Sequence, residues 1–223
     1  MDMRVERLHG WNVNIEQAFE IQRSLAGRIK QDKGLSQPRL IAGLDVSFNR
    51  MHEALAVAVV LEYPGLKVVE TVKVKGKVDF PYVPGLLSFR EVPLTLKACE
   101  EIKSEPDLVM VDGQGIAHPR RIGLASHLGL FLNLPTIGCA KSHLCGEFQD
   151  PGLESGETSK IIGDKGETIG AVVRTRTGVK PLFVSVGHKI NLSASVYWVL
   201  QCCRGYRVPE PTRLAHLASK EYF

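Results

Sequence analysis

Three strand-like runs follow one another early in the chain, and the links between them are too short to hold a helix. Residues 40–48 and 54–62 are mostly apolar, and residues 66–78 alternate, with valines set among lysines. Short links of this kind join antiparallel neighbours, so we expect an antiparallel meander. The alternation of the third run is typical of a strand at a sheet edge, with one face in solvent.

After the meander, helices and strands alternate. The spacing of apolar residues predicts them in this order: helix 88–103, strand 107–111, helix 122–132 and strand 136–140. Ser88 and Glu91 have capping-box spacing at the start of the first of these helices. This order predicts an α/β chain with a mixed sheet flanked by helices. It matches the ribonuclease-H-like architecture, whose active site is an acidic, metal-binding cluster.

Further elements are expected on either side of this core. Helical spacing predicts an N-terminal helix over 14–30, with Asn14 as its N-cap. Residues 147–166 are polar and glycine-rich, so we expect a loop or a poorly ordered insertion there. The C-terminal elements are expected as strands over 169–175 and 181–186 and helices over 192–204 and 212–220. We therefore predict a single domain over 1–223, with a catalytic core of about 39–142 and a C-terminal part of about 168–221.

The composition is that of an ordinary globular protein. Hydrophobic residues make up 44% and charged residues 23%, which excludes a disordered, collagen-like or coiled-coil chain. The net charge of +4 permits a polyanionic partner without requiring one. The 5 cysteines have no CxxC spacing, which favours a reduced protein. Because no apolar run approaches the roughly 20 residues that span a bilayer, we expect a cytoplasmic protein with no membrane partner.

Three acidic residues occupy positions suited to an active site. Asp45 lies inside the first strand, Asp112 ends the strand over 107–111, and Glu91 lies near a helix start. Open α/β sheets place their active sites at strand ends, and a buried carboxylate is costly unless it meets a cation. A shared Mg²⁺ or Mn²⁺ explains the three acids together, because these ions prefer oxygen ligands. The alternative for each acid alone is a turn cap or a pair with an arginine.

A proline-rich segment at 80–85 presents an aromatic side chain. Pro81 and Pro84 flank Tyr82 and stiffen the loop around it. A stiff loop of this kind can present Tyr82 as a wedge that fills the gap left by an extruded base. The alternative is a tyrosine that simply packs on the surface.

A second segment, at 111–121, combines glycines with basic residues. Gly113 and Gly115 allow a backbone to approach a ligand closely, and the basic residues of this segment are His118, Arg120 and Arg121. Lys141 follows the strand over 136–140, where it can meet a phosphate, although a lone lysine is more often simply solvated. The sequence has no Walker loop, nucleophile elbow or zinc-type Cys/His spacing, which excludes several common hydrolase classes.

Together these segments resemble endonuclease V, the deoxyinosine 3′-endonuclease family, in its bacterial form. The matching motifs run in family order: AGLDVSF at 42–48, FPYVPGLLSFRE at 80–91, VDGQG at 111–115 with HPR at 118–120, PTIG at 135–138 with Lys141, and PEPTR at 209–213 with His216. The clearest departure is low similarity over 147–166.

The resemblance implies a ribonuclease-H-like fold and Mg²⁺-dependent hydrolysis of DNA that contains deoxyinosine or other deaminated bases. Cleavage is expected at the second phosphodiester bond 3′ to the lesion, leaving 3′-hydroxyl and 5′-phosphate ends. The catalytic residues it implies are Asp45, Glu91, Asp112, His118, Lys141 and His216, with the three acids as metal ligands. The expected DNA and lesion contacts are Pro81, Tyr82, Pro84, Gly85, Gly113, Gln114, Gly115, Arg120 and Arg121.

We expect a monomer, in which Mn²⁺ can substitute for Mg²⁺. Three other functions stay open at this point. One is a related nuclease that acts on inosine-containing RNA. Another is a non-catalytic nucleic-acid-binding module on the same scaffold, and the third is an α/β protein whose acidic residues are incidental.

Overall fold

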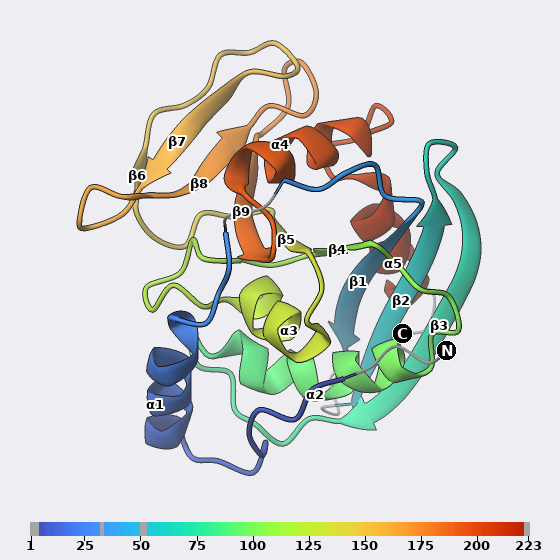
Figure 1. Cartoon of the computed structure of the whole chain (residues 1–223), viewed down its shortest axis with the longest axis vertical. Coiled ribbons are helices and arrows are strands. Elements are labelled where there is room, and N and C mark those ends of the chain that lie inside the picture. Colours follow the sequence, from blue (N-terminus) through green and yellow to red (C-terminus); the bar gives the residue numbers. More distant parts are fainter. Residues whose placement is uncertain (1–4, 32–33, 50–52, 221–223) are drawn as a thin grey trace.

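The computed structural model describes residues 5–31, 34–49 and 53–220, in which one large sheet is covered by helices (Figure 1). The strands are β1 (Leu40–Phe48), β2 (Glu53–Glu62), β3 (Lys67–Lys77), β4 (Leu108–Val111), β5 (Thr136–Ala140), β6 (Glu147–Phe148), β7 (Thr158–Ile162), β8 (Thr168–Val173) and β9 (Leu182–His188). The helices are α1 (Ile15–Ala26), α2 (Leu87–Glu100), α3 (Leu124–Leu132), α4 (Leu192–Gln201) and α5 (Glu210–Lys220).

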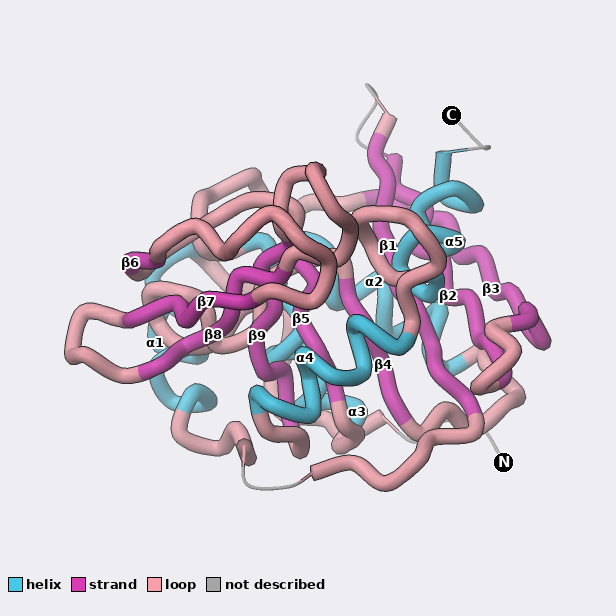
Figure 2. The backbone as a smooth tube through the Cα atoms, turned by 90° about the horizontal axis from the view of Figure 1, so that it is seen from above, coloured by secondary structure: helices cyan, strands magenta, loops and turns pink. Residues whose placement is uncertain are grey.

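The strand order confirms the predicted mixed sheet. The order is β3-β2-β1-β4-β5-β9-β8-β7-β6, and Figure 2 shows these strands side by side across the molecule. β1, β2 and β3 form the expected antiparallel meander, whereas β1, β4 and β5 run parallel. β3 lies at the sheet edge, with every second residue from Val69 on exposed, as its alternating sequence predicts. The ribonuclease-H-like fold class is therefore correct.

Helices cover both faces of the sheet, and β2 shows how its residues divide between them. Leu55, Val57 and Val59 pack with α4 and α5, whereas Ala56 and Ala58 pack with α2 and α3. A strand buried on both faces reads as a continuous apolar run, which is what this part of the sequence shows. α1 lies against the start of α2 and against α3.

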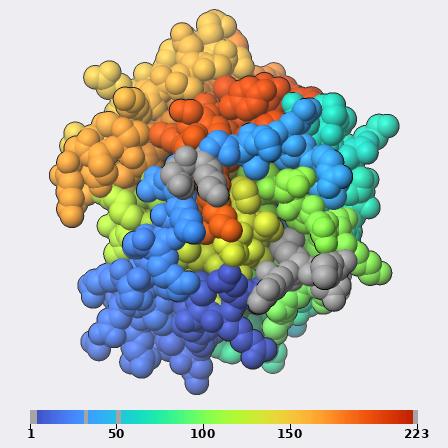
Figure 3. Space-filling view, in the orientation of Figure 1, coloured from blue at the N-terminus to red at the C-terminus, as the bar shows by residue number. Residues whose placement is uncertain are grey.

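The segment 147–166 is not the loop that its composition predicts. It contributes β6 and β7, which pair with each other and extend the sheet beyond β8. Figure 3 shows this region (orange) projecting at one side of the molecule, while the N-terminal segment (blue) covers another part of the same face. The strand signal is weak because β7 is only 5 residues long and Ile161 is its only fully buried side chain.

Several helix boundaries also differ from the predictions. The predicted capping box at Ser88 is wrong: α2 begins at Leu87, its N-cap is Leu86, and no side chain of the described residues caps it. α1, α2 and α4 end at Ala26, Glu100 and Gln201, which are before their expected ends. The predicted N-cap of α1 is confirmed, because the side chain of Asn14 accepts a hydrogen bond from the N–H of Gln17. Among the described residues, no helix has the length and apolar character that a membrane crossing requires.

Candidate active site

Two aspartates and a histidine from three elements meet beside the central strands. Ligand atoms of Asp45 in β1, Asp112 after β4, and His216 in α5 all lie within 4.8 Å of one another. The parallel register explains the first pair, because Leu44 pairs with Val111 and the next residue on each strand is the aspartate. The structure therefore brings Asp45 and Asp112 together as the sequence predicts.

We call Asp45, Asp112 and His216 the acidic cluster. His216 reaches the two aspartates because α5 packs directly on β1. A side chain at Gly43 would overlap the backbone carbonyl of Pro211 in the first turn of α5, so only glycine permits this approach. The approach places His216 with Nδ1 3.3 Å from Oδ2 of Asp45. The hydroxyl of Ser219 donates to the same oxygen at 2.6 Å, so the carboxylate of Asp45 is held in one orientation.

Asp112 has a cationic partner within the fold. Its Oδ2 forms an ion pair with Nζ of Lys141, which follows β5. Burial is the largest influence on the pKa of Asp112 and raises it, although Lys141 opposes the shift. Lys141 therefore lies beside the cluster, as predicted, and neutralises part of its negative charge.

Glu91 lies near this cluster but is not one of its three members. It sits in the second turn of α2 with 8% of its surface exposed. Burial, followed by the negative charges of Asp45 and Asp112, raises its pKa to about 8. Glu91 is thus close enough to be destabilised by the two aspartates, and a cation between them would relieve that repulsion.

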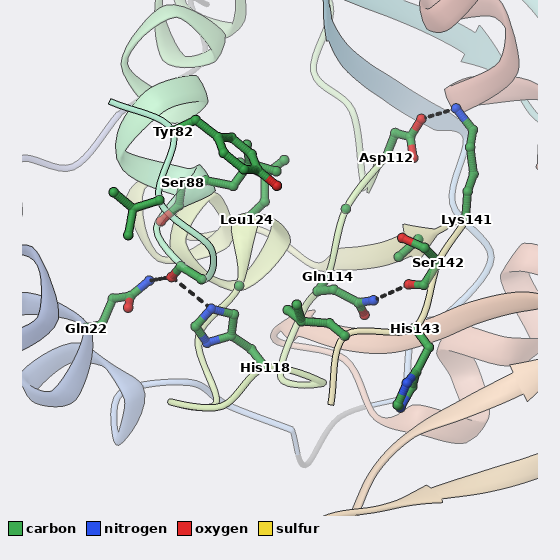
Figure 4. Close-up of a pocket in the computed structure, with 17 residues that line it drawn as sticks. Gln22, Tyr82, Ser88, Asp112, Gln114, His118, Leu124, Lys141, Ser142 and His143 are labelled. Atoms are coloured by element: carbon green, nitrogen blue, oxygen red, sulfur yellow. Dashed lines mark hydrogen bonds and ion pairs between the residues drawn. The ribbon is translucent and has the colours of Figure 1, made fainter. Parts of the chain in front are cut away.

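A cavity of about 270 Å³ opens beside Asp112. Figure 4 shows Tyr82, Ser88 and Leu124 on one side of it and Asp112, Lys141 and Ser142 on the other. Of the predicted DNA and lesion contacts, Tyr82, Gly85, Gly113 and Gln114 line this cavity, whereas Pro81, Pro84, Gly115, Arg120 and Arg121 are not among the described residues that line it. Because Asp112 and Lys141 line the cavity and also contact each other, the cavity adjoins the acidic cluster.

The loop that carries Tyr82 is fastened at Gly85. The Gly85 carbonyl accepts hydrogen bonds from Gln22 Nε2 at 3.0 Å, His118 Nε2 at 3.0 Å and Arg120 Nη2 at 2.9 Å. Gly85 has a φ of +79°, a left-handed conformation that favours glycine. These three side chains, which we call the Gly85 clamp, fix the end of the loop. Tyr82 itself remains 72% exposed at the cavity.

His118 is neutral in this arrangement. Its Nε2 donates to the Gly85 carbonyl, and its Nδ1 accepts from the N–H of Arg120 at 3.2 Å. Burial, reinforced by the charge of Arg120, lowers its pKa to about 4. At neutral pH His118 therefore positions the loop as a neutral ring, and its expected contact with a phosphate stays a prediction.

Arg121 has partners of its own within the fold. Its guanidinium pairs with Asp164 and with Glu167 and also donates to the carbonyl of His118. These contacts join the segment after β4 to the turn between β7 and β8. Arg121 therefore contributes contacts within the fold, and its expected contact with DNA stays a prediction.

Sequence reasoning missed Gln22 and Ser88 as members of the site. Gln22 lies on the buried side of α1, in line with Ala18 and Leu25, and is 1% exposed. A glutamine on an apolar helix face was the available signal, but nothing local identifies its distant partners. The spacing of Ser88 from Glu91 predicted a helix-capping serine, and this prediction concealed its place in the cavity wall.

A second hollow also adjoins the acidic cluster. It is lined by Asp45, Val46, Ser47, Phe48, His216 and Lys220. Asp112 thus lines the first hollow, and Asp45 and His216 line the second.

Comparisons with known proteins agree over nearly the whole chain. The endonuclease V family model matches residues 23–217, which include all the described strands. An endonuclease V from Gloeobacter violaceus is 53% identical over 212 residues, or 94% of this chain and 86% of that protein. The solved endonuclease V of Bacillus subtilis has a TM-score of 0.94 at 34% identity, covering 98% of this chain and 96% of that one. The solved endonuclease V of Ciona intestinalis, in complex with DNA containing an inosine followed by a ribo-adenosine, has a TM-score of 0.81 at 32% identity. The match covers 94% of this chain and 98% of that one.

Proposed function

The chain belongs to the endonuclease V family and is therefore an endonuclease, and we propose that it acts in DNA repair on deoxyinosine and other deaminated bases. In this proposal it hydrolyses the second phosphodiester bond 3′ to the lesion, with Mg²⁺ as its cofactor, and leaves 3′-hydroxyl and 5′-phosphate ends. The observation that carries the proposal is that a base-sized cavity adjoins an acidic cluster. Asp112 lines the cavity and belongs to the cluster, and Lys141 lines the cavity and contacts Asp112.

Asp45 and Asp112 are the residues that would hold the metal ion, with Glu91 beside them. Carboxylate oxygens suit Mg²⁺, and Mn²⁺ accepts the same ligands. The raised pKa of Glu91 supports the fit: burial is its largest cause, the negative charges of Asp45 and Asp112 add to it, and a cation among these carboxylates would relieve that added repulsion. When bound, such an ion polarises the scissile phosphoryl oxygen and lowers the pKa of an attacking water. His216 and Ser219 orient Asp45 for this role.

Lys141 is placed to act on the phosphate beside the cavity. Its side chain is 37% exposed while its ammonium group contacts Asp112. A fixed positive charge beside the reacting phosphate stabilises the negative charge that grows in the transition state. Lys141 can reach a phosphate of the nucleotide next to the lesion because it also lines the cavity.

Base recognition is assigned to the cavity and Tyr82. An enzyme that reads a base in a duplex must extrude it, and an aromatic side chain can fill the gap that remains. Tyr82 is exposed at the cavity, on a loop that the Gly85 clamp fixes. α2 begins at the cavity wall without a side-chain cap among the described residues, so the N–H groups of Leu87 and Ser88 are available to a base carbonyl, whereas that of Phe89 donates to the carbonyl of Leu86. Hypoxanthine has such a carbonyl where adenine has an amino group.

A nuclease that acts on inosine-containing RNA is the second candidate. The observation that favours it concerns a relative: the Ciona intestinalis endonuclease V was solved with an inosine followed by a ribo-adenosine. Cleavage rates on matched ribo- and deoxyribo-substrates distinguish the two candidates. A higher rate on the deoxyribo-substrate is the expected result for this chain.

The test of the proposed function is to map the cut on an end-labelled duplex that contains one deoxyinosine, in the presence of Mg²⁺. We expect a single nick at the second bond 3′ to the lesion, none on the matched adenine duplex, and none with Asp45→Ala. A nick at another bond, or full activity of Asp45→Ala, would contradict the proposal.

A further inference from the structure

A chain of hydrogen bonds leads from the cavity wall into the interior. The hydroxyl of Ser88, which lines the cavity, lies 2.9 Å from Nδ1 of His127. Nε2 of His127 lies 2.8 Å from Nε2 of His9, and Nδ1 of His9 lies 2.8 Å from the carbonyl oxygen of Gly10. We call Ser88, His127 and His9 the relay.

The far end of the relay fixes the direction of every bond in it. A carbonyl oxygen only accepts, so Nδ1 of His9 must donate to Gly10. A neutral His9 then has Nε2 as an acceptor, so Nε2 of His127 must donate to it. This leaves Nδ1 of a neutral His127 as an acceptor, and the hydroxyl of Ser88 must donate to it.

The surroundings keep both imidazoles neutral. His127 is fully buried, and burial lowers its pKa to about 3. Burial also lowers the pKa of His9, although its bond to Gly10 opposes the shift. The rings of Trp11, Phe89 and Phe131 pack around the two histidines. The directions of the bonds are therefore set at neutral pH.

The orientation of the Ser88 hydroxyl has a consequence for what the cavity accepts. A serine hydroxyl has one hydrogen and two lone pairs, and the relay uses the hydrogen. Toward the cavity, the hydroxyl oxygen of Ser88 can therefore only accept a hydrogen bond. Hypoxanthine carries a hydrogen on ring nitrogen N1, whereas adenine and unsubstituted purine carry a lone pair there.

We propose that the relay makes Ser88 a specificity-determining residue, which accepts a hydrogen bond from a ring N–H and disfavours bases with a lone pair at that position. Ser88 touches the base, and His127 and His9 are positioning residues that act through it. The inference deepens the proposed function and rests on it. A hydroxyl held in one direction discriminates because the wrong base leaves two lone pairs facing each other.

The test compares single-turnover cleavage of two duplexes that differ only in the lesion, hypoxanthine or unsubstituted purine, with Mg²⁺ at neutral pH. In His127→Leu the Ser88 hydroxyl loses its acceptor and is free to turn its hydrogen into the cavity. We expect cleavage at hypoxanthine to fall about tenfold, as for the loss of one hydrogen bond, and cleavage at purine to rise. Loosened packing alone would lower both rates alike, and that result would overturn the relay.

Two further variants make the result specific. Gln at position 127 can donate to His9 and accept from Ser88, so His127→Gln should keep the hypoxanthine-to-purine ratio within about threefold of the wild type. Phe131→Leu removes a ring that packs on His127 without touching a bond of the relay, and should leave the ratio unchanged. A ratio that changes in Phe131→Leu as much as in His127→Leu would overturn the relay.

Ser88→Ala provides a readout that does not depend on how His127→Leu folds. It removes the acceptor itself, so the ratio should fall by about tenfold. An unchanged ratio in Ser88→Ala, with wild-type cleavage at hypoxanthine, would overturn the relay and leave the proposed function standing. Absence of cleavage at hypoxanthine by the wild-type chain would overturn the proposed function, and the relay with it.

Discussion

The two halves of the candidate site are built on opposite electrostatic principles. In the acidic half, Asp45, Asp112 and Glu91 concentrate like charge, and burial together with this repulsion raises the pKa of Glu91. In the base half, around the cavity and the Gly85 clamp, neutral hydrogen bonds hold the loop in place: three donors meet the Gly85 carbonyl and His118 is neutral, while the buried Oε1 of Gln114 has no partner among the described residues. The acidic half therefore gains from an added cation, whereas the base half is already organised to receive its ligand.

The largest effect should separate chemistry from recognition. Asp45→Asn keeps the size of the side chain and removes a charge that the acidic half needs. We expect the single-turnover cleavage rate to fall by about a thousandfold or more, as for loss of a metal's charge stabilisation. Affinity for an inosine duplex without divalent metal should stay within about threefold, because Asp45 is not among the described residues that line the base cavity.

The control for this experiment is Glu100→Gln, at the exposed end of α2. It removes one acid from the same domain and should change neither the rate nor the affinity. If Asp45→Asn loses affinity together with rate, the two halves are one unit and the comparison fails.

The acidic half was the easier of the two to predict, because its geometry follows from local patterns. A parallel pair of strands aligns their ends, so an acid inside the first strand and an acid after the fourth were expected to meet. The Gly85 clamp could not be predicted in this way. Gln22, His118 and Arg120 lie 63, 33 and 35 residues from Gly85 in sequence, and no periodicity encodes such contacts.

The errors also have a physical cause. Ser88 has the type and spacing of a capping residue, but its hydroxyl bonds to His127, 39 residues away. Composition did not reveal the strands in 147–166 because β6 and β7 are short and Ile161 is their only buried residue, so they lack the apolar runs that mark buried strands. His216 was expected near the metal site from the resemblance alone, and its contact with Asp45 depends on the close packing of α5 on β1 at Gly43.

The next effect is on the pH dependence of stability in the acidic half. Folding raises the pKa of Glu91 from its ordinary value of 4.5 to about 8. Between these values the unfolded chain releases a proton that the folded chain keeps, so stability falls as pH rises from 4.5 to 8. Glu91→Gln removes this loss, and should raise the unfolding temperature of the metal-free protein at pH 8 more than at pH 4.

Thermal unfolding at a series of pH values, with and without Mg²⁺, measures this effect. Mg²⁺ should stabilise the wild type at pH 8 more than it stabilises Glu91→Gln, because the ion relieves the same repulsion. Lys97→Gln, at an exposed position of the same helix, is the control and should leave the pH profile unchanged. Parallel pH profiles for the wild type and Glu91→Gln would show that the acidic half carries no such strain.

A smaller effect is expected when the base half is loosened. Gln22→Leu keeps the buried volume, removes one donor from the Gly85 carbonyl, and leaves Nε of Arg120 without its acceptor. We expect a three- to tenfold rise in KM for the inosine duplex, about the value of one buried hydrogen bond, with kcat unchanged. Glu16→Gln, on the exposed side of the same helix, should change neither constant. A fall in kcat without a change in KM would place Gln22 in the chemistry and contradict the division into halves.

The smallest effect should come from Arg121, which the sequence suggested as a DNA contact. Its charge is already matched by Asp164 and Glu167, and these two side chains are 77% and 39% exposed. Exposed ion pairs contribute little to stability, so Arg121→Gln should shift the urea midpoint only slightly. A residue that contacts a phosphate contributes about one unit to the slope of log affinity against log salt concentration. The slope for an inosine duplex should therefore be the same in Arg121→Gln and the wild type. A slope reduced by about one unit would mean that DNA displaces the two acids and takes Arg121 as a phosphate contact, so that this part of the base half, like the acidic half, is completed by its ligand.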